Sequence, residues 1–149
     1  MSTLLKLPSQ KMLAKYLKHC SEQREDKSSA TWQCQLPNLS FPVSASIWIQ
    51  GVVVDIKNSG STVVVDDGTG TVTLVQCDSA ASKVMTKKGM YIMAWLFVSG
   101  MYIMAVGSLE TGGEQPTVKP IKLQDLSELD DVDALWPLEV LHQINFLNG

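Results

Sequence analysis

Two adjacent carboxylates are the residues of this chain that come nearest to a chemical site. Asp66 and Asp67 open the segment DDGTG at residues 66–70. Paired carboxylates can hold a metal ion, or they can share a proton because two close negative charges raise the pKa of one of them. The glycines that follow favour a tight turn, in which aspartate accepts backbone hydrogen bonds and glycine takes a positive φ. We therefore expect a structural turn here.

The histidines and cysteines of the chain do not occur in any arrangement typical of a catalytic or metal site. His19 and His142 lie in opposite terminal segments, and no glycine-rich phosphate loop or GxSxG motif occurs. The chain has three cysteines, Cys20, Cys34 and Cys77, an odd number with no CxxC spacing. This pattern fits neither a disulfide framework nor a tetrahedral zinc site. We expect a reducing compartment, no enzymatic activity, no metal and no cofactor.

The charge balance argues against a strongly basic surface. The 149 residues carry 12 Lys and Arg against 15 Asp and Glu, a formal net charge of −3, and Arg24 is the single arginine. Clustered cations provide most of the affinity for a nucleic-acid backbone. With 45% hydrophobic residues, the chain can fill the core of one domain. Its first residues include no apolar run of signal-peptide length, so we do not expect secretion.

One uncharged stretch, residues 89–109, has the length of a membrane span. Within it the hexapeptide GMYIMA occurs twice, at residues 89–94 and 100–105. Without one of the two copies, the remaining stretch has the length of a strand, and its Tyr, Ile, Val, Phe and Trp residues favour strands. A membrane-inserted protein is therefore only the third hypothesis, and we expect no membrane association.

Hydrophobic periodicity predicts a strand-rich centre between two helices. Residues 9–20 predict a short helix, because Met12, Tyr16 and Cys20 recur at helical spacing. Residues 21–29 are polar and predict a loop. A second helix is expected near the end, where acidic residues precede Pro137 as a first helical residue. The predicted strands are 32–36, 47–56, 61–66, 71–76 and 116–124, with helical turns at 79–88 and one or more strands in the repeated segment.

This order of elements predicts an all-β fold with flanking helices. Strands in a meander, a helix after the third barrel strand and further strands describe a single OB-fold, a five-stranded Greek-key barrel. The expected organisation is an N-terminal helix and polar loop over 1–30, the barrel over 31–128 and a C-terminal partner-packing helix over 129–149. The tandem repeat at 89–107 falls inside the barrel.

Single-stranded DNA binding is the alternative function for such a barrel. OB-folds bind single strands through aromatic and basic residues on their second and third strands. The corresponding segments, 61–66 and 71–76, contain no aromatic residue, no Lys and no Arg. We therefore expect weak or no direct DNA binding.

The C-terminal helix indicates a protein partner instead. Residues 137–146 carry one acid, Glu139, and no Lys or Arg, while Val140, Leu141 and Ile144 contribute to an apolar stripe. Covering the barrel explains one face of this helix, but a helix that is apolar most of the way round favours a second apolar surface. A partner helix is the sharper hypothesis.

Several segments together resemble the RecQ-mediated genome instability protein 2 family. They run in the family's order across most of the chain, and the tail Trp-x-Leu-Glu-Val after Asp-Leu-Ser is the most specific of them. The segments are KMLAKYL at 11–17, IWIQGVVV at 47–54, GMYIMAVG at 100–107, IKLQDLSE at 121–128 and ALWPLEVLH at 134–142.

The resemblance implies a nuclear, non-catalytic OB-fold subunit. Its barrel would pair with the C-terminal OB domain of RecQ-mediated genome instability protein 1 by packing of their C-terminal helices. The pair would then support topoisomerase III-alpha and a Bloom-type RecQ helicase, which dissolve double Holliday junctions in DNA repair, and dock a peptide of the Fanconi anaemia M helicase. A stand-alone single-stranded DNA-binding OB protein is the alternative.

The family's partner-binding positions transfer to particular residues of this chain. Trp48 matches a first-strand tryptophan that could equally be core, and Lys11 and Lys122 match surface lysines. The tail supplies the remaining candidates, Trp136, Leu138, Val140 and Leu141, to which Ile144 of the same apolar stripe is added.

The sequence departs from the family pattern at two places. Pro137 stands where the family tail has Glu, and both GMYIMA copies have Met where the family strand has Lys. The family needs one such strand and this chain offers two. We expect the second copy to be the native strand, because Val106 and Gly107 continue it in the family's manner.

Overall fold

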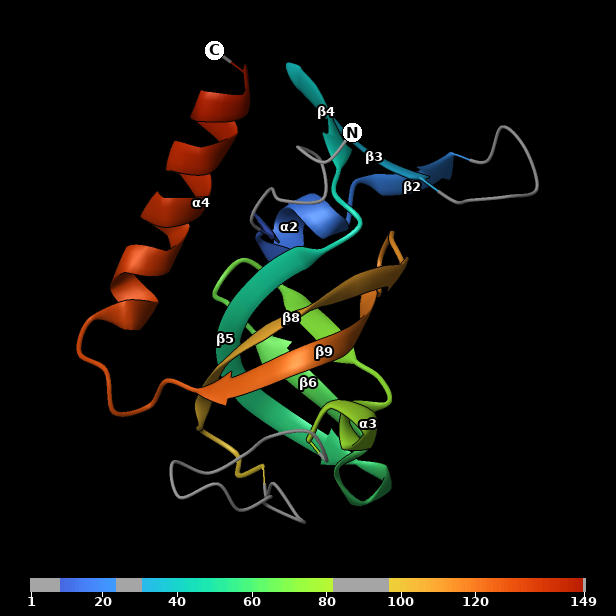
Figure 1. Ribbon diagram of the computed structural model, residues 1–149. Coiled ribbons are helices and arrows are strands. Elements are labelled where there is room, and N and C mark those ends of the chain that lie inside the picture. Colours follow the sequence, from blue (N-terminus) through green and yellow to red (C-terminus); the bar gives the residue numbers. More distant parts are fainter. Residues whose placement is uncertain (1–8, 24–30, 82–96, 149) are drawn as a thin grey trace, which may run out of the picture.

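A closed five-stranded barrel forms the centre of the molecule. The computed structural model describes residues 9–23, 31–81 and 97–148 (Figure 1). Antiparallel pairs join β5 to β6, β6 to β7, β8 to β9 and β5 to β8, and a parallel pair joins β7 to β9. This circuit is the predicted OB-fold. The barrel strands are β5 (Ile47–Lys57), β6 (Thr62–Asp66), β7 (Thr71–Leu74), β8 (Tyr102–Thr111) and β9 (Thr117–Asp125).

The four barrel strands predicted outside the repeat are confirmed to within two residues at each end. Strand β5 is the longest and pairs with β8 along its first half and with β6 along its second. Its register shifts between Val53 and Asp55, as a bulge does where a strand must bend. At Gly51 a Cβ atom would lie 2.5 Å from Val65 Cγ1, so β5 approaches β6 too closely for any larger residue.

The second GMYIMA copy provides the start of β8, and the first copy at 89–94 lies outside the described residues. Ile103 and Ala105 of the second copy pair with Gly51 and Ile49 of β5. A Cβ atom on Gly107 would collide with the Lys119 carbonyl of β9. The residue at the equivalent position after the first copy is Leu96. The register of β8 therefore suits the second copy and not the first.

Short elements close the two ends of the barrel. The 3-10 turn η1 (Asn58–Gly60) connects β5 to β6, and α3 (Cys77–Ala81) follows β7. Figure 1 places α3 at one end of the barrel and α2 (Ala14–Leu17) at the other. The predicted helical turns at 79–88 are therefore observed only at their start, and residues 82–88 lie outside the described residues.

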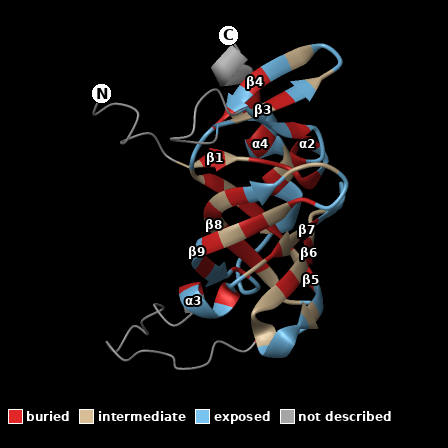
Figure 2. Cartoon of the chain, turned by 90° about the vertical axis from the view of Figure 1, so that its right-hand side faces the viewer, coloured by how far each residue is buried: buried red, intermediate tan, exposed pale blue. Residues whose placement is uncertain are grey.

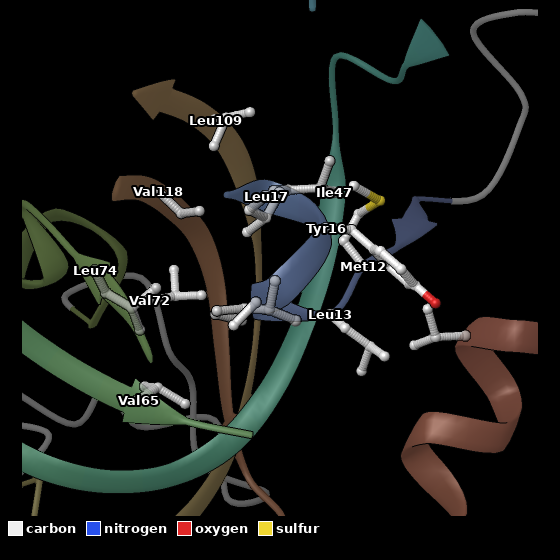
Figure 3. Packing of buried hydrophobic residues seen from close by; sticks show 14 of the residues in the cluster. Met12, Leu13, Tyr16, Leu17, Ile47, Val65, Val72, Leu74, Leu109 and Val118 are labelled. Carbon is white, nitrogen blue, oxygen red and sulfur yellow. The ribbon is translucent and has the colours of Figure 1, made fainter. Parts of the chain in front are cut away.

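The predicted helix over 9–20 is wrong in its extent. Residues Gln10–Lys11 form strand β1, which pairs in parallel with Ile47 and Trp48 of β5, and only Ala14–Leu17 are helical. The helix starts late because the first part of the segment is drawn into the sheet. Leu13 and Leu17 of this segment then pack with Val72, Leu74, Leu109 and Val118 of the barrel interior (Figure 3).

The turn at 66–70 holds this N-terminal helix in place. Gly68 has φ +91° and donates its N–H to Asp66 Oδ1 at 2.8 Å, while the Thr69 N–H donates to Asp67 Oδ1 at 2.8 Å. The predicted structural turn is confirmed. In addition, Asp67 Oδ2 accepts the Ala14 N–H at 2.7 Å, and Thr69 Oγ1 accepts the Lys15 N–H at 3.1 Å. A distant turn thus satisfies the free amides at the start of α2.

A second, three-stranded sheet lies beside the barrel. It consists of β2 (Cys20–Gln23), β3 (Thr31–Leu36) and β4 (Leu39–Val43) in antiparallel order. The strand predicted at 32–36 is confirmed. The loop predicted at 21–29 is wrong for Ser21–Gln23, which belong to an edge strand whose exposed polar side chains show no hydrophobic alternation. Strand β4 was not predicted. The β2–β3 pairing also crosses the expected boundary at residue 30.

The C-terminal helix α4 (Val132–Asn148) begins before the predicted start. Pro137 lies inside the helix rather than at its first residue. Pro137 is the sixth helical residue and cannot donate a hydrogen bond to the Asp133 carbonyl, yet the helix continues through it to Asn148. The Leu135 N–H already donates to the Asp131 carbonyl at 3.0 Å. No helix among the described residues is long and apolar enough to cross a membrane.

Buried residues, red in Figure 2, recur along the barrel strands. Strand β2, in contrast, is exposed at three of its four residues. The fully buried residues include Met12, Leu17, Ile47, Val53, Leu74 and Val118. The core therefore depends on the N-terminal segment as well as on the five barrel strands.

We expect Asp67→Ala to reduce the free energy of unfolding by about 1–2 kcal/mol, because it removes an N-terminal cap of α2 together with the turn's own bonds. Urea unfolding measures the loss. Asp66→Ala is the matched control, since Asp66 accepts only the Gly68 N–H in its own turn. Equal losses in the two variants would contradict the role of the Asp67 contact with Ala14.

Candidate partner-binding surface

Helix α4 presents apolar residues on two opposite faces. On the inner face Trp136, Val140 and Ile144, spaced four residues apart, are 1%, 0% and 5% exposed. On the outer face Leu135, Leu138 and Leu141, spaced three residues apart, are 51%, 61% and 43% exposed. The inner face packs on this chain's own barrel, so the outer leucines are the apolar residues available to another protein.

A row of side chains on the barrel receives the inner face of α4. Lys11 pairs with Trp48, Trp48 with Val106, and Val106 with Lys122. Residues directly opposite each other on neighbouring strands point to the same side of a sheet. These four side chains therefore form one row across β1, β5, β8 and β9, which we call the Trp48 row.

Trp136 packs against the centre of the Trp48 row. The ring centroids of Trp48 and Trp136 lie 5.9 Å apart with the planes tilted by 32°, within the range of favourable aromatic pairs. Both indole N–H groups are buried without a hydrogen-bond partner among the described residues. The two rings are therefore held by packing and apolar burial rather than by polar contacts.

Lys11 joins the N-terminal strand to this helix by three contacts. Its ammonium lies 5.1 Å from the centroid of the Trp48 ring and 3.3 Å from Glu139 Oε1. Its backbone N–H donates to Gln143 Oε1 at 2.5 Å. Because the Glu139 side chain is 46% exposed, solvent screens the ion pair, and its main effect is to orient the two side chains.

A shallow pocket of about 550 Å³ lies between β1 and the outer part of α4. Apolar side chains and one lysine–glutamate pair line it, so it suits a largely apolar side chain with a polar neighbour. Its lining residues are Lys11, Val132, Leu135, Leu138, Glu139 and His142.

The surroundings of α4 are acidic. Glu128, Asp130, Asp131 and Asp133 are exposed at or just before its first turn. Burial raises the pKa of the Tyr102 phenol, and the negative charges of Asp133, Asp67 and Glu139 raise it further. The Tyr102 hydroxyl therefore stays protonated and donates to Gln50 Oε1 at 3.2 Å. The outer leucines are thus bordered by negative charge.

The strands on which OB-folds bind single-stranded DNA offer little to a base or a phosphate here. In the β6–β7 ladder Val64 pairs with Thr73 and Asp66 with Thr71. At the end of β5 Lys57 lies 3.8 Å from Asp55, and just after α2 Lys18 lies 3.6 Å from Glu114. No group of His, Cys, Asp and Glu in the described part of the chain could hold a metal ion.

The structure places the sequence-predicted residues in three groups. Lys11, Trp48 and Trp136 are in contact, and Lys122 is exposed in the same row. Val140 and Ile144 are buried on the inner face, whereas Leu138 and Leu141 are exposed. The partner-binding roles of all eight residues stay predictions.

Three residues of the surface were not predicted. Leu135 extends the outer leucines, and Glu139 and Gln143 bind Lys11. The spacing of Leu135 three residues before Leu138 is the signal that could have revealed it. The contacts of Lys11 had no such signal, because they depend on β1 being a strand.

Comparison with protein families gives a match over nearly the whole chain. The model of the family described as RecQ-mediated genome instability protein 2 matches residues 8–144. A protein of that name from Gallus gallus is 26% identical over 102 residues, covering 66% of this chain and 67% of its own length.

Solved structures show the same fold at low sequence identity. The telomere capping protein Ten1 from Saccharomyces pombe has a TM-score of 0.51 and 10% identity, covering 95% of this chain and 100% of that one. A chain of a replication protein A heterotrimer bound to single-stranded DNA has a TM-score of 0.55 and 13% identity, covering 95% and 98%. Both support the OB-fold.

The two faces of α4 predict opposite effects on the isolated chain. We expect Trp136→Ala to lower the free energy of unfolding by about 3–5 kcal/mol, as loss of a buried tryptophan does. Leu138→Ala should change it by less than about 0.5 kcal/mol, because the side chain is exposed. Chemical denaturation measures both values. A large loss for Leu138→Ala would show that the outer face is packed internally.

Proposed function

The chain belongs to the RecQ-mediated genome instability protein 2 family, and from this premise we propose that it is a non-catalytic scaffold subunit that pairs with an OB domain of a larger protein. It is an OB-fold protein of a genome-stability family. The proposed partner is the C-terminal OB domain of RecQ-mediated genome instability protein 1, bound through α4.

The exposed leucines of α4 are the observation that carries this proposal. Leu135, Leu138 and Leu141 form an apolar strip on a helix whose other face is already buried. An apolar strip on a helix fits a hydrophobic groove or another helix. The pocket beside Leu135 and Leu138 gives the strip a place for a partner side chain to insert.

Charge defines the chemistry of the partner more narrowly. The acids at and before the first turn of α4 border the leucine strip, and residues 123–149 contain no Lys or Arg. Complementary potentials favour association of the correct partner and disfavour others. The partner surface should therefore be apolar at its centre and basic near the start of α4.

The candidate residues divide into two roles in this proposal. Leu138 and Leu141 contact the partner directly, together with Leu135. Trp136, Val140 and Ile144 hold the helix against Trp48 so that the leucines face outward. Lys11 lines the pocket, and the exposed Lys122 in the Trp48 row would contribute at the rim of the surface.

The paired subunits would act in the nucleus as a platform for DNA repair. They would support topoisomerase III-alpha and a Bloom-type RecQ helicase in dissolving double Holliday junctions, and dock the Fanconi anaemia M helicase. In this assembly the OB-fold part, residues 31–128, which includes the barrel strands from Ile47 to Asp125, lies between an N-terminal part, 1–30, and the partner-packing part, 129–149. The family match supports this assignment.

Co-expression with the C-terminal OB domain of the larger partner tests the pairing. We expect Leu138→Asp to raise the Kd at least about 10-fold, equivalent to about 1.4 kcal/mol, because it places a charge at the centre of an apolar contact. Isothermal titration calorimetry or a pull-down with quantified bands measures the change. Trp136→Ala should weaken the pairing as well, through loss of the helix position.

Val98→Asp is the matched control, because Val98 is 60% exposed and lies just before β8 rather than on α4. It should pair as the unmodified chain does. If Leu138→Asp leaves the Kd unchanged while the chain stays folded, the outer face of α4 is not the interface.

Fluorescence anisotropy with a labelled oligonucleotide tests the alternative of a stand-alone DNA-binding protein. We expect weak binding with a shallow dependence on salt, because few cations lie near β6 and β7. A tight complex whose affinity falls steeply with salt would favour the alternative. The measurement needs only the isolated chain and a salt series.

A further inference from the structure

Two cysteines face each other in the small sheet beside the barrel. Cys20 of β2 is paired directly with Cys34 of β3. Both thiols donate to the same acceptor, the Tyr16 carbonyl oxygen, at 3.4 Å each. The two residues are 6% and 0% exposed, and both are free thiols. Their sulfur atoms therefore converge on one point at the base of α2.

We propose that Cys20 and Cys34 are a redox-sensitive pair that hydrogen peroxide converts to a disulfide joining β2 to β3. Directly opposite residues of antiparallel strands have Cα atoms about 4.5–5.5 Å apart. A disulfide is compatible with Cα separations of about 4.4–6.8 Å. The Cα separation expected for such a pair therefore lies within the range that a disulfide spans.

The closeness of the two sulfur atoms favours Cys34 as the nucleophile. In the dithiol both S–H groups donate to the Tyr16 carbonyl, but when Cys34 loses its proton the Cys20 S–H can turn to the Cys34 thiolate, which lowers the pKa of the Cys34 thiol. The same contact, together with burial, raises the pKa of the Cys20 thiol. Thiolates are the reactive form of cysteine, so oxidation begins at Cys34.

The reaction balances with peroxide as the oxidant. The Cys34 thiolate attacks one peroxide oxygen, so that an S–O bond forms, the O–O bond breaks, and the departing hydroxide takes a proton to become water. Cys20 then loses its proton and attacks the Cys34 sulfur, so that the S–S bond forms and the S–O bond breaks. The second hydroxide takes that proton, and the pair has passed two electrons to peroxide.

Cys77 provides an internal contrast. It is fully buried on α3, and burial and the neighbouring Asp78 raise the pKa of its thiol to about 12. No other cysteine faces it in the described part of the chain. Cys77 should therefore remain a free thiol under the same treatment.

The bridge would fix the sheet beside the N-terminal segment that completes the barrel core. A Cβ atom on Gly112 would collide with the Cys20 carbonyl, and the Gly113 N–H donates to the Leu17 carbonyl at 3.3 Å. Cys20 thus lies where the small sheet meets the β8–β9 connection. In a reducing compartment the thiols are the resting state and the disulfide is transient. This inference does not depend on the function proposed for α4.

Peptide mapping of the full chain tests the pair. The protein is treated with hydrogen peroxide, denatured, alkylated and digested with trypsin without reduction. Because Arg24 and Lys27 lie between the two cysteines, trypsin separates residues 19–24 from residues 28–57. We expect these two peptides to remain joined, to separate on reduction, and to leave Cys77 as the alkylated residue.

Two variants identify the residues involved. Cys77→Ser should form the same cross-link, and Cys34→Ser should not, with circular dichroism confirming that each is folded. Peroxide should raise the Tm of the unmodified chain and of Cys77→Ser, and a reducing agent should reverse the rise. The peptide map of the unmodified chain is sufficient to overturn the proposal. It does so if Cys20 and Cys34 are both alkylated after peroxide treatment, or if they become sulfinic acids without a cross-link. A disulfide from either residue to Cys77 or to a second chain would overturn it as well.

Discussion

The parallel pairing of Gln10 and Lys11 with β5 fixes the positions of both flanking helices. After these two residues the Met12 N–H donates to the Trp48 carbonyl at 3.0 Å, which directs the chain into the barrel end where α2 begins. Lys11 also holds α4, because its backbone and side chain bind Gln143 and Glu139. One short strand thus links the segment that completes the core to the helix that carries the outer leucines.

The barrel could be predicted from the sequence because its strands are half-buried and alternate in hydrophobicity. β6 and β7 show the alternation in its simplest form, with Val63, Val65, Val72 and Leu74 inside. The N-terminal segment could not be predicted in the same way. Met12 and Leu13 fit a helix by spacing, yet the helix begins only where Asp67 and Thr69 supply hydrogen-bond acceptors from a distant turn. β2 was missed because its polar residues carry no alternation, and its pairing depends on β3.

Eight residues of the candidate surface could be named from the sequence, but Leu135, Glu139 and Gln143 and the geometry of the surface could not. Trp48, Trp136, Lys11 and Lys122 come from four distant segments, and the structure gathers them on or against one row. An apolar helix sequence does not reveal which face meets its own barrel, since both faces carry large aliphatic residues. That choice is made by Trp48, whose ring stacks with Trp136 and so turns Leu138 and Leu141 outward. Pro137 gave a misleading start for the helix, because proline favours the first helical position but here stands inside α4, which begins at Val132.

Strands β6 and β7 of this barrel carry different side chains from those by which OB-folds bind a single strand. The β6–β7 turn lies on the two strands that such domains use, and here Asp67 and Thr69 of that turn accept backbone amides of α2. The side chains that pair across these strands are Val, Leu, Thr and Asp, which provide neither stacking surface nor positive charge. The largest exposed aliphatic side chains with a pocket beside them lie instead on α4. Because the acids around that helix repel phosphate and attract basic side chains, the electrostatics of the surface favour a protein partner over a nucleic acid.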